Sequence, residues 1–208
     1  MSDLTLQAEN LHSWRGDRHV LRGVSFALQS RECLQVTGPN GTGKTTLLRT
    51  LAGLAHPEEG EIRWRGQGIR GDLRAFQADL AYIGHEAPLK PDLSATENLR
   101  FWIGVRRRLG PQEIASTLNR VGAAHWGDRP VRTLSAGQKR RVTLAGLMLT
   151  RAPLWLLDEP TTNLDTAGQR LVAEMIEEHL ATGGLVVAAV HHELPRGASL
   201  VHRLELAA

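Results

Sequence analysis

The sequence predicts an α/β protein: a parallel sheet covered by helices, with a small antiparallel β region and an inserted helical segment. Short apolar runs at 33–36, 154–157 and 185–190 have the length of buried strands, and helical patterns separate them. Strands that alternate with helices in this way form parallel sheets, because each crossover helix packs back onto the sheet. Residues 4–28 instead alternate apolar and polar side chains around a turn, which is typical of antiparallel strands.

The composition is that of an ordinary globular protein. The 208 residues, 41% hydrophobic and 23% charged, can form one large domain or a core with one subdomain. Lys and Arg exceed Asp and Glu by 25 − 22 = 3, a modest positive charge that suits a phosphate ligand or a nearby anionic membrane. No run approaches the ~18 apolar residues of a membrane span, and no signal-peptide pattern starts the chain. With Cys33 as its single cysteine, we expect a reducing, cytoplasmic location.

The first half of the chain is expected to supply most of the strands. A turn at Arg15-Gly16-Asp17 interrupts the alternating region. Strands are expected at 20–28 and 33–36, followed by a helix at 46–52 that ends near Gly53. Two more strands are expected at 60–64 and 80–83.

From Ser94 onward the apolar period becomes helical. Ser94-Ala95-Thr96-Glu97 has the pattern of a capping box, and Pro111 can open the next helix. The basic run at 106–108 is most simply a solvated helix end. The later elements are a helix, a strand, a helix and a strand, at 136–150, 154–157, 166–180 and 185–190. We therefore expect a single domain over 1–208, with a core of 1–85 and 151–208 and a helical subdomain of 86–150.

A glycine-rich loop of the form G-x-x-x-x-G-K-T lies between the strand at 33–36 and the helix at 46–52. This strand–loop–helix order is the context that a phosphate-binding loop requires. Its glycines let backbone N–H groups approach phosphate oxygens, Lys44 is placed for the β- and γ-phosphates, and the Thr45 hydroxyl for Mg²⁺. The candidate ATP-binding residues of this segment are Gly38, Pro39, Asn40, Gly41, Thr42, Gly43, Lys44, Thr45 and Thr46.

Two carboxylates, Asp158 and Glu159, end the apolar strand at 154–157. The carboxyl end of a core strand lies beside the ligand in an open α/β sheet. Asp158 is therefore a candidate Mg²⁺ ligand, and Glu159 can orient and polarise an attacking water. A solvent-exposed strand end is the plain alternative, but the phosphate loop upstream favours the catalytic interpretation.

The string Leu134-Ser135-Ala136-Gly137-Gln138 completes a pattern. Loop, L-S-x-G-Q, apolar-D-E and a later His, in this order, resemble the nucleotide-binding subunit of an ABC transporter over essentially the whole chain. The resemblance implies that Ser135, Gly137 and Gln138 close over the γ-phosphate held by another copy of the chain. Two ATP molecules are then sandwiched in a head-to-tail homodimer, and Thr162-Asn163-Leu164-Asp165 resembles the loop that communicates across that interface.

Three further positions follow from the resemblance. His191 resembles the histidine that contacts the γ-phosphate, with the adjacent His192 as the alternative. Trp14 either stacks on adenine or packs as an ordinary surface tryptophan. His85 stands where the family has a Mg²⁺-associated Gln, although imidazole lacks the amide oxygen of that side chain.

Gly84-His85, the string at 93–101 and the short length closely resemble one subfamily, the ATP-binding subunits of cytochrome c maturation (haem exporter) complexes. The resemblance implies ATP hydrolysis with integral membrane subunits at the cytoplasmic face of the inner membrane, coupled to release of a haem-loaded chaperone. We expect no nucleic-acid partner and no direct haem binding, since the chain has no C-x-x-C-H and Cys33 suits a core strand. Alternatives are an ABC subunit for another substrate, or a soluble ABC-type ATPase in DNA repair or translation.

Overall fold

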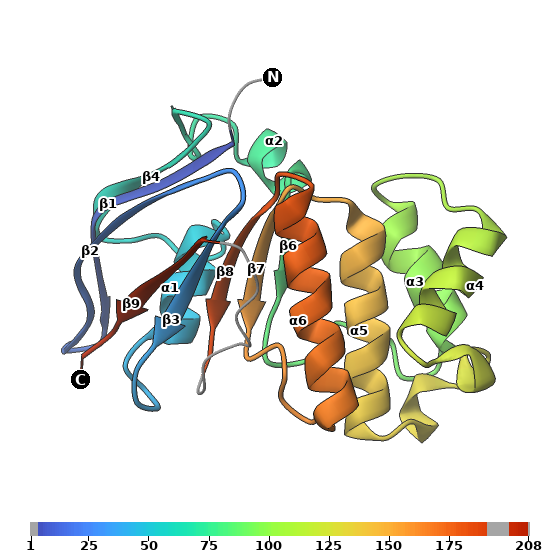
Figure 1. Ribbon diagram of the computed structural model, residues 1–208. Coiled ribbons are helices and arrows are strands. Elements are labelled where there is room, and N and C mark those ends of the chain that lie inside the picture. The colour runs from blue at the N-terminus through green and yellow to red at the C-terminus, as the bar shows by residue number, and fades with distance from the viewer. Residues whose placement is uncertain (1–3, 191–199, 208) are drawn as a thin grey trace. The chain divides into compact units, whose positions relative to one another are not determined.

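A computed structural model describes residues 4–190 and 200–207, and Figure 1 shows their elements. The chain divides into two compact units. The first comprises Met1–Gly84, Ala152–Pro160 and Ile176–Ala208, and the second His85–Arg151 and Thr161–Met175. From the sequence we expected the boundaries between core and helical subdomain beside residues 85 and 151, with 161–175 in the core. In the structure this segment groups with the second unit.

The first unit contains an antiparallel sheet in the order β2-β1-β4-β5. Its strands are β1 (Thr5–Arg15), β2 (Arg18–Gln29), β4 (Glu59–Trp64) and the short β5 (Gln67–Gly68). Leu6, Ala8 and Leu11 of β1 are buried between more exposed neighbours, as the alternating sequence predicted.

The same unit contains a parallel sheet in the order β6-β7-β8-β3-β9, which confirms the predicted α/β fold class. Every residue of β7 and β8 is buried, which explains their continuous apolar sequences. The strands are β3 (Glu32–Thr37), β6 (Leu80–Ile83), β7 (Leu154–Asp158), β8 (Leu185–Ala189) and β9 (Leu200–Glu205). The sequence analysis did not identify β9.

Helix α1 (Lys44–Leu51) shares one hydrophobic core with both sheets. Its Leu47, Leu48 and Leu51 are fully buried in a cluster that includes residues of β1, β3, β7 and β8. A second helix, α2 (Leu73–Ala78), was not expected. Asp72 caps α2, since its side-chain oxygen accepts a hydrogen bond from the Ala75 amide at 2.9 Å.

Helix α6 (Thr166–Ala181) places His179 against the β7 strand. The imidazole stacks on the Trp155 indole with ring centroids 3.9 Å apart and an interplanar angle of 7°. A Cβ at Gly184 would lie 2.2 Å from the His179 ring, so only glycine leaves room for this stack. Burial lowers the pKa of His179 from 6.5 to about 4.

This histidine should make stability depend on pH. Between pH 6.5 and 4, His179 is protonated in the unfolded chain but stays neutral in the folded protein. The free energy of unfolding therefore decreases as pH falls through this window. The loss should reach roughly 3 kcal/mol at the low end, since one pKa unit is worth about 1.4 kcal/mol. Urea unfolding of the wild type, His179→Phe and the exposed control His125→Gln at pH 7.5 and 5 measures it. In His179→Phe the difference in the free energy of unfolding between pH 7.5 and 5 should be much smaller than in the wild type, and in the control it should equal that of the wild type. A wild-type difference in His179→Phe would refute the lowered pKa of His179.

The second unit contains the helices α3 (Ala95–Gly104), α4 (Pro111–Arg120) and α5 (Ala136–Thr150), together with the first part of α6. The short 3-10 turns Ala124–Trp126 and Val131–Thr133 lie between α4 and α5. The predicted capping box of Ser94 and Glu97 is present at α3, and Pro111 is the first residue of α4.

The basic run at 106–108 is not uniformly solvated. Arg107 is half-buried: its Nε donates to the Leu149 carbonyl at 3.0 Å and its Nη1 to Glu113 at 3.0 Å. Arg151 donates to the same Glu113 carboxylate at 2.9 Å. Arg107 thus joins the end of α3 to α4 and α5, whereas Arg106 and Arg108 are exposed.

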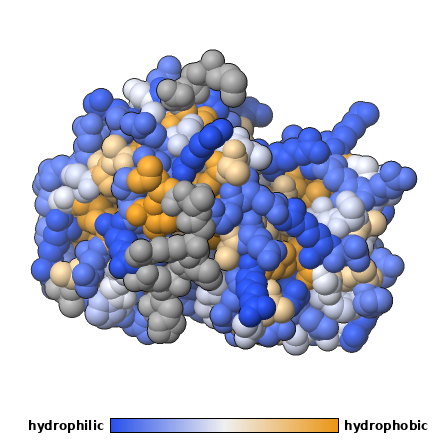
Figure 2. Space-filling view, in the orientation of Figure 1, coloured by the Kyte–Doolittle hydropathy of each residue, from blue (hydrophilic) through white to orange (hydrophobic). Residues whose placement is uncertain are grey.

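Over residues 4–190 and 200–207, none of the helices combines the length and the apolar character that crossing a membrane requires. In Figure 2 most of the visible surface is hydrophilic, with apolar residues gathered in places between the hydrophilic ones.

Candidate functional site

The carboxyl ends of β3, β8 and β7 form one edge of the parallel sheet. Val36 and Asp158 both pair with Ala189 of β8, which lies between them. Two backbone hydrogen bonds continue the pairing beyond the strand ends. The Val190 N–H donates to the Val36 carbonyl and the Glu159 N–H to the Ala189 carbonyl, each at 3.0 Å. At a strand spacing of ~4.8 Å, the backbones of Val36 and Asp158 lie roughly 10 Å apart. The glycine-rich loop and the two acidic residues are therefore neighbours, as the sequence predicted.

The loop between β3 and α1 packs closely against its surroundings. Gly43, which caps α1, has a left-handed backbone with φ 106°, and a Cβ there would lie 2.6 Å from Cγ1 of Val20. Gly38 has φ 140°, and a Cβ there would lie 2.4 Å from the Leu206 carbonyl oxygen. Any side chain at either position would push β2 or the C-terminal segment away.

Lys44 points back into the loop. Its side chain is almost wholly buried, and its ammonium donates to the carbonyls of Gly38 at 2.6 Å and Pro39 at 3.0 Å. The Thr42 hydroxyl donates to the same Pro39 carbonyl. These contacts hold a positive charge within the curve of the loop, where a bound anion would meet it together with the amides at the start of α1. Next to it, Thr45 is exposed and Thr46 is buried.

The acidic pair at the end of β7 combines burial with an unusual backbone. Asp158 is 2% exposed. On the neighbouring β6, burial of the Tyr82 side chain and the nearby charge of Asp158 raise the pKa of the Tyr82 hydroxyl. Glu159 has φ 49°, a left-handed conformation that non-glycine residues adopt infrequently. Such conformations persist only where the surrounding structure stabilises them, and they are frequent at functional sites.

The L-S-x-G-Q string forms the start of α5 in the second unit. Ser135 is the N-cap: its hydroxyl oxygen accepts the Gln138 amide at 3.2 Å, and Gln138 Oε1 accepts the Ser135 amide at 2.9 Å. This capping box is a local structural role for Ser135 and Gln138 that the sequence analysis missed. A Cβ at Gly137 would lie 2.7 Å from the Asn163 carbonyl, so glycine allows the segment 162–165 to lie against α5.

An ion pair holds the same segment on α5. Arg141 donates to Asp165 at 2.9 Å and, with its other terminal nitrogen, to the Val121 carbonyl at 2.9 Å. The Gly168 amide and the Arg141 guanidinium together hold the pKa of Asp165 below its usual range.

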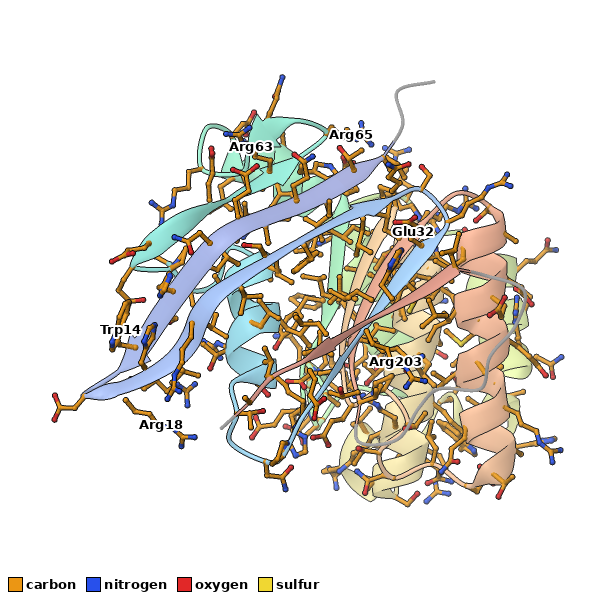
Figure 3. All side chains as sticks on the ribbon, turned by 60° about the vertical axis from the view of Figure 1, so that its left-hand side comes forward. Trp14, Arg18, Glu32, Arg63, Arg65 and Arg203 are labelled. Carbon is orange, nitrogen blue, oxygen red and sulfur yellow. The ribbon has the colours of Figure 1, made fainter. Side chains whose placement is uncertain are left out.

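Trp14 lies at the end of β1 in a stack of rings. Its indole is 4.0 Å from the His19 imidazole at an angle of 6°, and His12 Nδ1 and His19 Nε2 share a hydrogen bond of 2.9 Å. Figure 3 shows Trp14 at the β1–β2 hairpin. His19 covers one face of the indole, so a base could stack only on the other.

Of the predicted histidines, only His85 falls within the described residues. His85 is exposed and follows β6 as the first residue of the second unit. His191, with its alternative His192, lies outside the described residues. Within the first unit the structure brings together the loop, Lys44, Asp158 and Glu159.

The fold and the loop define a nucleotide-binding α/β ATPase. The protein family described as ABC transporter matches residues 21–162. The cytochrome c biogenesis ATP-binding export protein CcmA of Methylococcus capsulatus is 47% identical over 93% of this chain and 94% of its own length. The protein of the same name in Salmonella typhi is 46% identical over 97% and 96%.

Solved structures agree with these relatives. A putative ABC transporter ATP-binding protein from Pyrococcus furiosus superposes with a TM-score of 0.84 at 25% identity, over 97% of each chain. The chain therefore belongs to the ATP-binding proteins of the ABC transporter family and, among them, to the CcmA cytochrome c biogenesis ATP-binding export proteins. It is an ATPase that binds ATP.

Proposed function

We propose that the chain is the ATP-hydrolysing subunit of the haem exporter used in cytochrome c maturation. The similarity to the CcmA proteins carries this proposal, because it extends over more than nine-tenths of both chains. In this proposal hydrolysis drives the release of a haem-loaded chaperone by partner proteins. Both compact units together act as one ATPase domain over 1–208.

Each catalytic role follows from the chemistry of one side chain. Lys44 neutralises the β- and γ-phosphates, with the backbone N–H groups of the loop, which Pro39 lacks, around them. Glu159 orients and polarises the attacking water, for which its position at the end of β7 is suitable. His191 contacts the γ-phosphate, and Trp14 offers the indole face opposite His19 to the adenine.

Mg²⁺ suits the oxygen atoms present at this edge of the sheet. Asp158 provides a buried carboxylate and Thr45 an exposed hydroxyl at the start of α1, and Mg²⁺ prefers such ligands together with substrate phosphates. Thr45 and Asp158 would hold the ion, with His85 a further candidate that would act through a water molecule. The bound ion supplies charge neutralisation on the phosphates.

The proposed assembly is a homodimer bound to integral membrane subunits at the cytoplasmic face of the inner membrane. Ser135, Gly137 and Gln138 would serve the nucleotide of the partner subunit, because the amides at the start of α5 form a suitable site for a γ-phosphate. Haem stays with the membrane partners and the chaperone. The absence of a C-x-x-C-H string and the burial of Cys33 in β3 support this assignment.

Deleting the chain should abolish mature c-type cytochromes while b-type cytochromes and haem synthesis continue. Haem staining of denatured membrane proteins measures the c-type products, and reduced-minus-oxidised spectra measure the b-type. The wild-type chain supplied in trans should restore the c-type products, and Glu159→Gln should not. Normal c-type cytochromes in the deletion strain would overturn the haem assignment and leave the ATPase activity untouched.

A further inference from the structure

The β1–β2 hairpin brings an arginine to the phosphate loop. Arg18 is the first residue of β2 and is exposed. A Cβ built on Gly41 would lie 3.8 Å from Nη1 of Arg18, so the guanidinium lies beside the backbone of the loop. Figure 3 shows the Arg18 side chain extending from the hairpin near Trp14.

Neighbouring contacts fix the strand that carries this arginine. Val20 contacts the loop two residues further on, with Cγ1 2.6 Å from a Cβ built on Gly43. Side chains at i and i+2 of a strand point to the same side, so Arg18 and Val20 both face the loop. His19, between them, stacks on Trp14, and its carbonyl accepts a hydrogen bond from Arg22 at 3.2 Å.

No structural partner accounts for the position of Arg18. Among residues 4–190 and 200–207, its side chain makes no hydrogen bond or ion pair, whereas Arg22 bonds to a carbonyl and Arg63 pairs with Glu61 at 2.8 Å. A guanidinium is a planar fork of donors that matches the oxygens of a phosphate. The observed geometry therefore leaves this fork directed toward a loop whose amides and Lys44 already favour an anion.

We propose that Arg18 binds the phosphate chain of the nucleotide as a residue outside the loop motif. This inference rests on the proposed nucleotide site at 38–46. Arg18 would approach the phosphates from the hairpin, and Lys44 from inside the loop. Losing a charge-assisted contact of this kind should weaken nucleotide binding about tenfold or more.

The affinity of the full chain for MgATP, measured by calorimetry, tests the proposal. Arg18→Ala should bind about tenfold more weakly, and Arg18→Lys should recover part of the loss because it keeps the charge but not the fork. Arg74→Ala, which removes an exposed arginine from α2, is the matched control and should bind as the wild type does. Wild-type affinity in Arg18→Ala, or an equal loss in the control, would overturn the proposal.

Inorganic tripolyphosphate as a competitor separates phosphate contacts from base contacts. Arg18→Ala should weaken its inhibition by a similar factor; unchanged inhibition would mean that Arg18 does not act on the phosphates. The unfolding midpoint of the ligand-free variant should be unchanged, because the side chain is exposed. Lys44→Ala distinguishes a failure of the proposed Arg18 contact from a failure of the proposed nucleotide site. If it too retains wild-type affinity, the nucleotide-site assignment itself fails, whereas a loss confined to Lys44→Ala rejects only the role of Arg18.

Discussion

Replacing Glu159 with glutamine is expected to lower ATP turnover by about 10²-fold or more while ATP binding is retained. Glutamine has the same shape as glutamate but cannot accept the proton of an attacking water, and a positioned base typically contributes 10²- to 10⁴-fold. Phosphate release under saturating ATP measures turnover, and equilibrium titration measures binding. The two quantities should separate, because the proposed nucleotide-binding residues at 38–46 are unchanged.

The backbone of Glu159 makes a careful control necessary. Its φ of 49° is maintained by the surrounding structure, including the hydrogen bond from its amide to Ala189. Glutamine can adopt the same conformation, so the unfolding midpoint should change little. Glu174→Gln, an exposed change on α6, should turn over ATP at the wild-type rate. If Glu159→Gln also did so, another group would have to orient the water.

The conformation of the glycine-rich loop at 38–46 could be predicted from the sequence because its contacts are local. Lys44 bonds to Gly38 and Pro39, only six and five positions earlier, so the spacing in the sequence already contains the geometry. The position of Asp158 was predictable for a related reason, since carboxyl ends of parallel strands meet at one edge of the sheet.

The capping box in the L-S-x-G-Q string could also have been predicted from the sequence. Ser135 and Gln138 have the same S-x-x-E/Q spacing as Ser94 and Glu97, which was identified as a capping box from the sequence. The resemblance to ABC transporter subunits instead predicts a ligand contact for this string. The two roles are compatible, because a cap on α5 also orders the amides that would face a phosphate.

Other features depend on the tertiary structure and have little local signal. Strand β9 is an edge strand whose central residues are His202 and Arg203, and it forms by pairing with β3. The approach of Arg18 to Gly41 depends on how the hairpin packs on the loop. The stack of Trp14 on His19 likewise requires the β1–β2 register, which contains shifts between Ala8 and Trp14.

Mixing two inactive variants is expected to restore ATPase activity if the site is completed by the partner subunit. Lys44→Ala disables the phosphate loop, and Ser135→Arg places a bulky cation where the γ-phosphate of the partner's nucleotide would lie. In a head-to-tail dimer one composite site then contains both lesions and the other contains neither. Random pairing of equal amounts should recover up to roughly a quarter of the wild-type sites, since half of the dimers are mixed.

The matched control mixes Lys44→Ala with Glu159→Gln. Both lesions lie in the first unit and on the same side of each composite site, so every site in the mixed dimer remains defective. This mixture should stay inactive while the first recovers. Because dimers form by mass action, wild-type activity should also rise faster than linearly with protein concentration. Recovery in neither mixture, together with strictly linear concentration dependence, would show that Ser135 does not serve a second subunit and that α5 is capped for structural reasons alone.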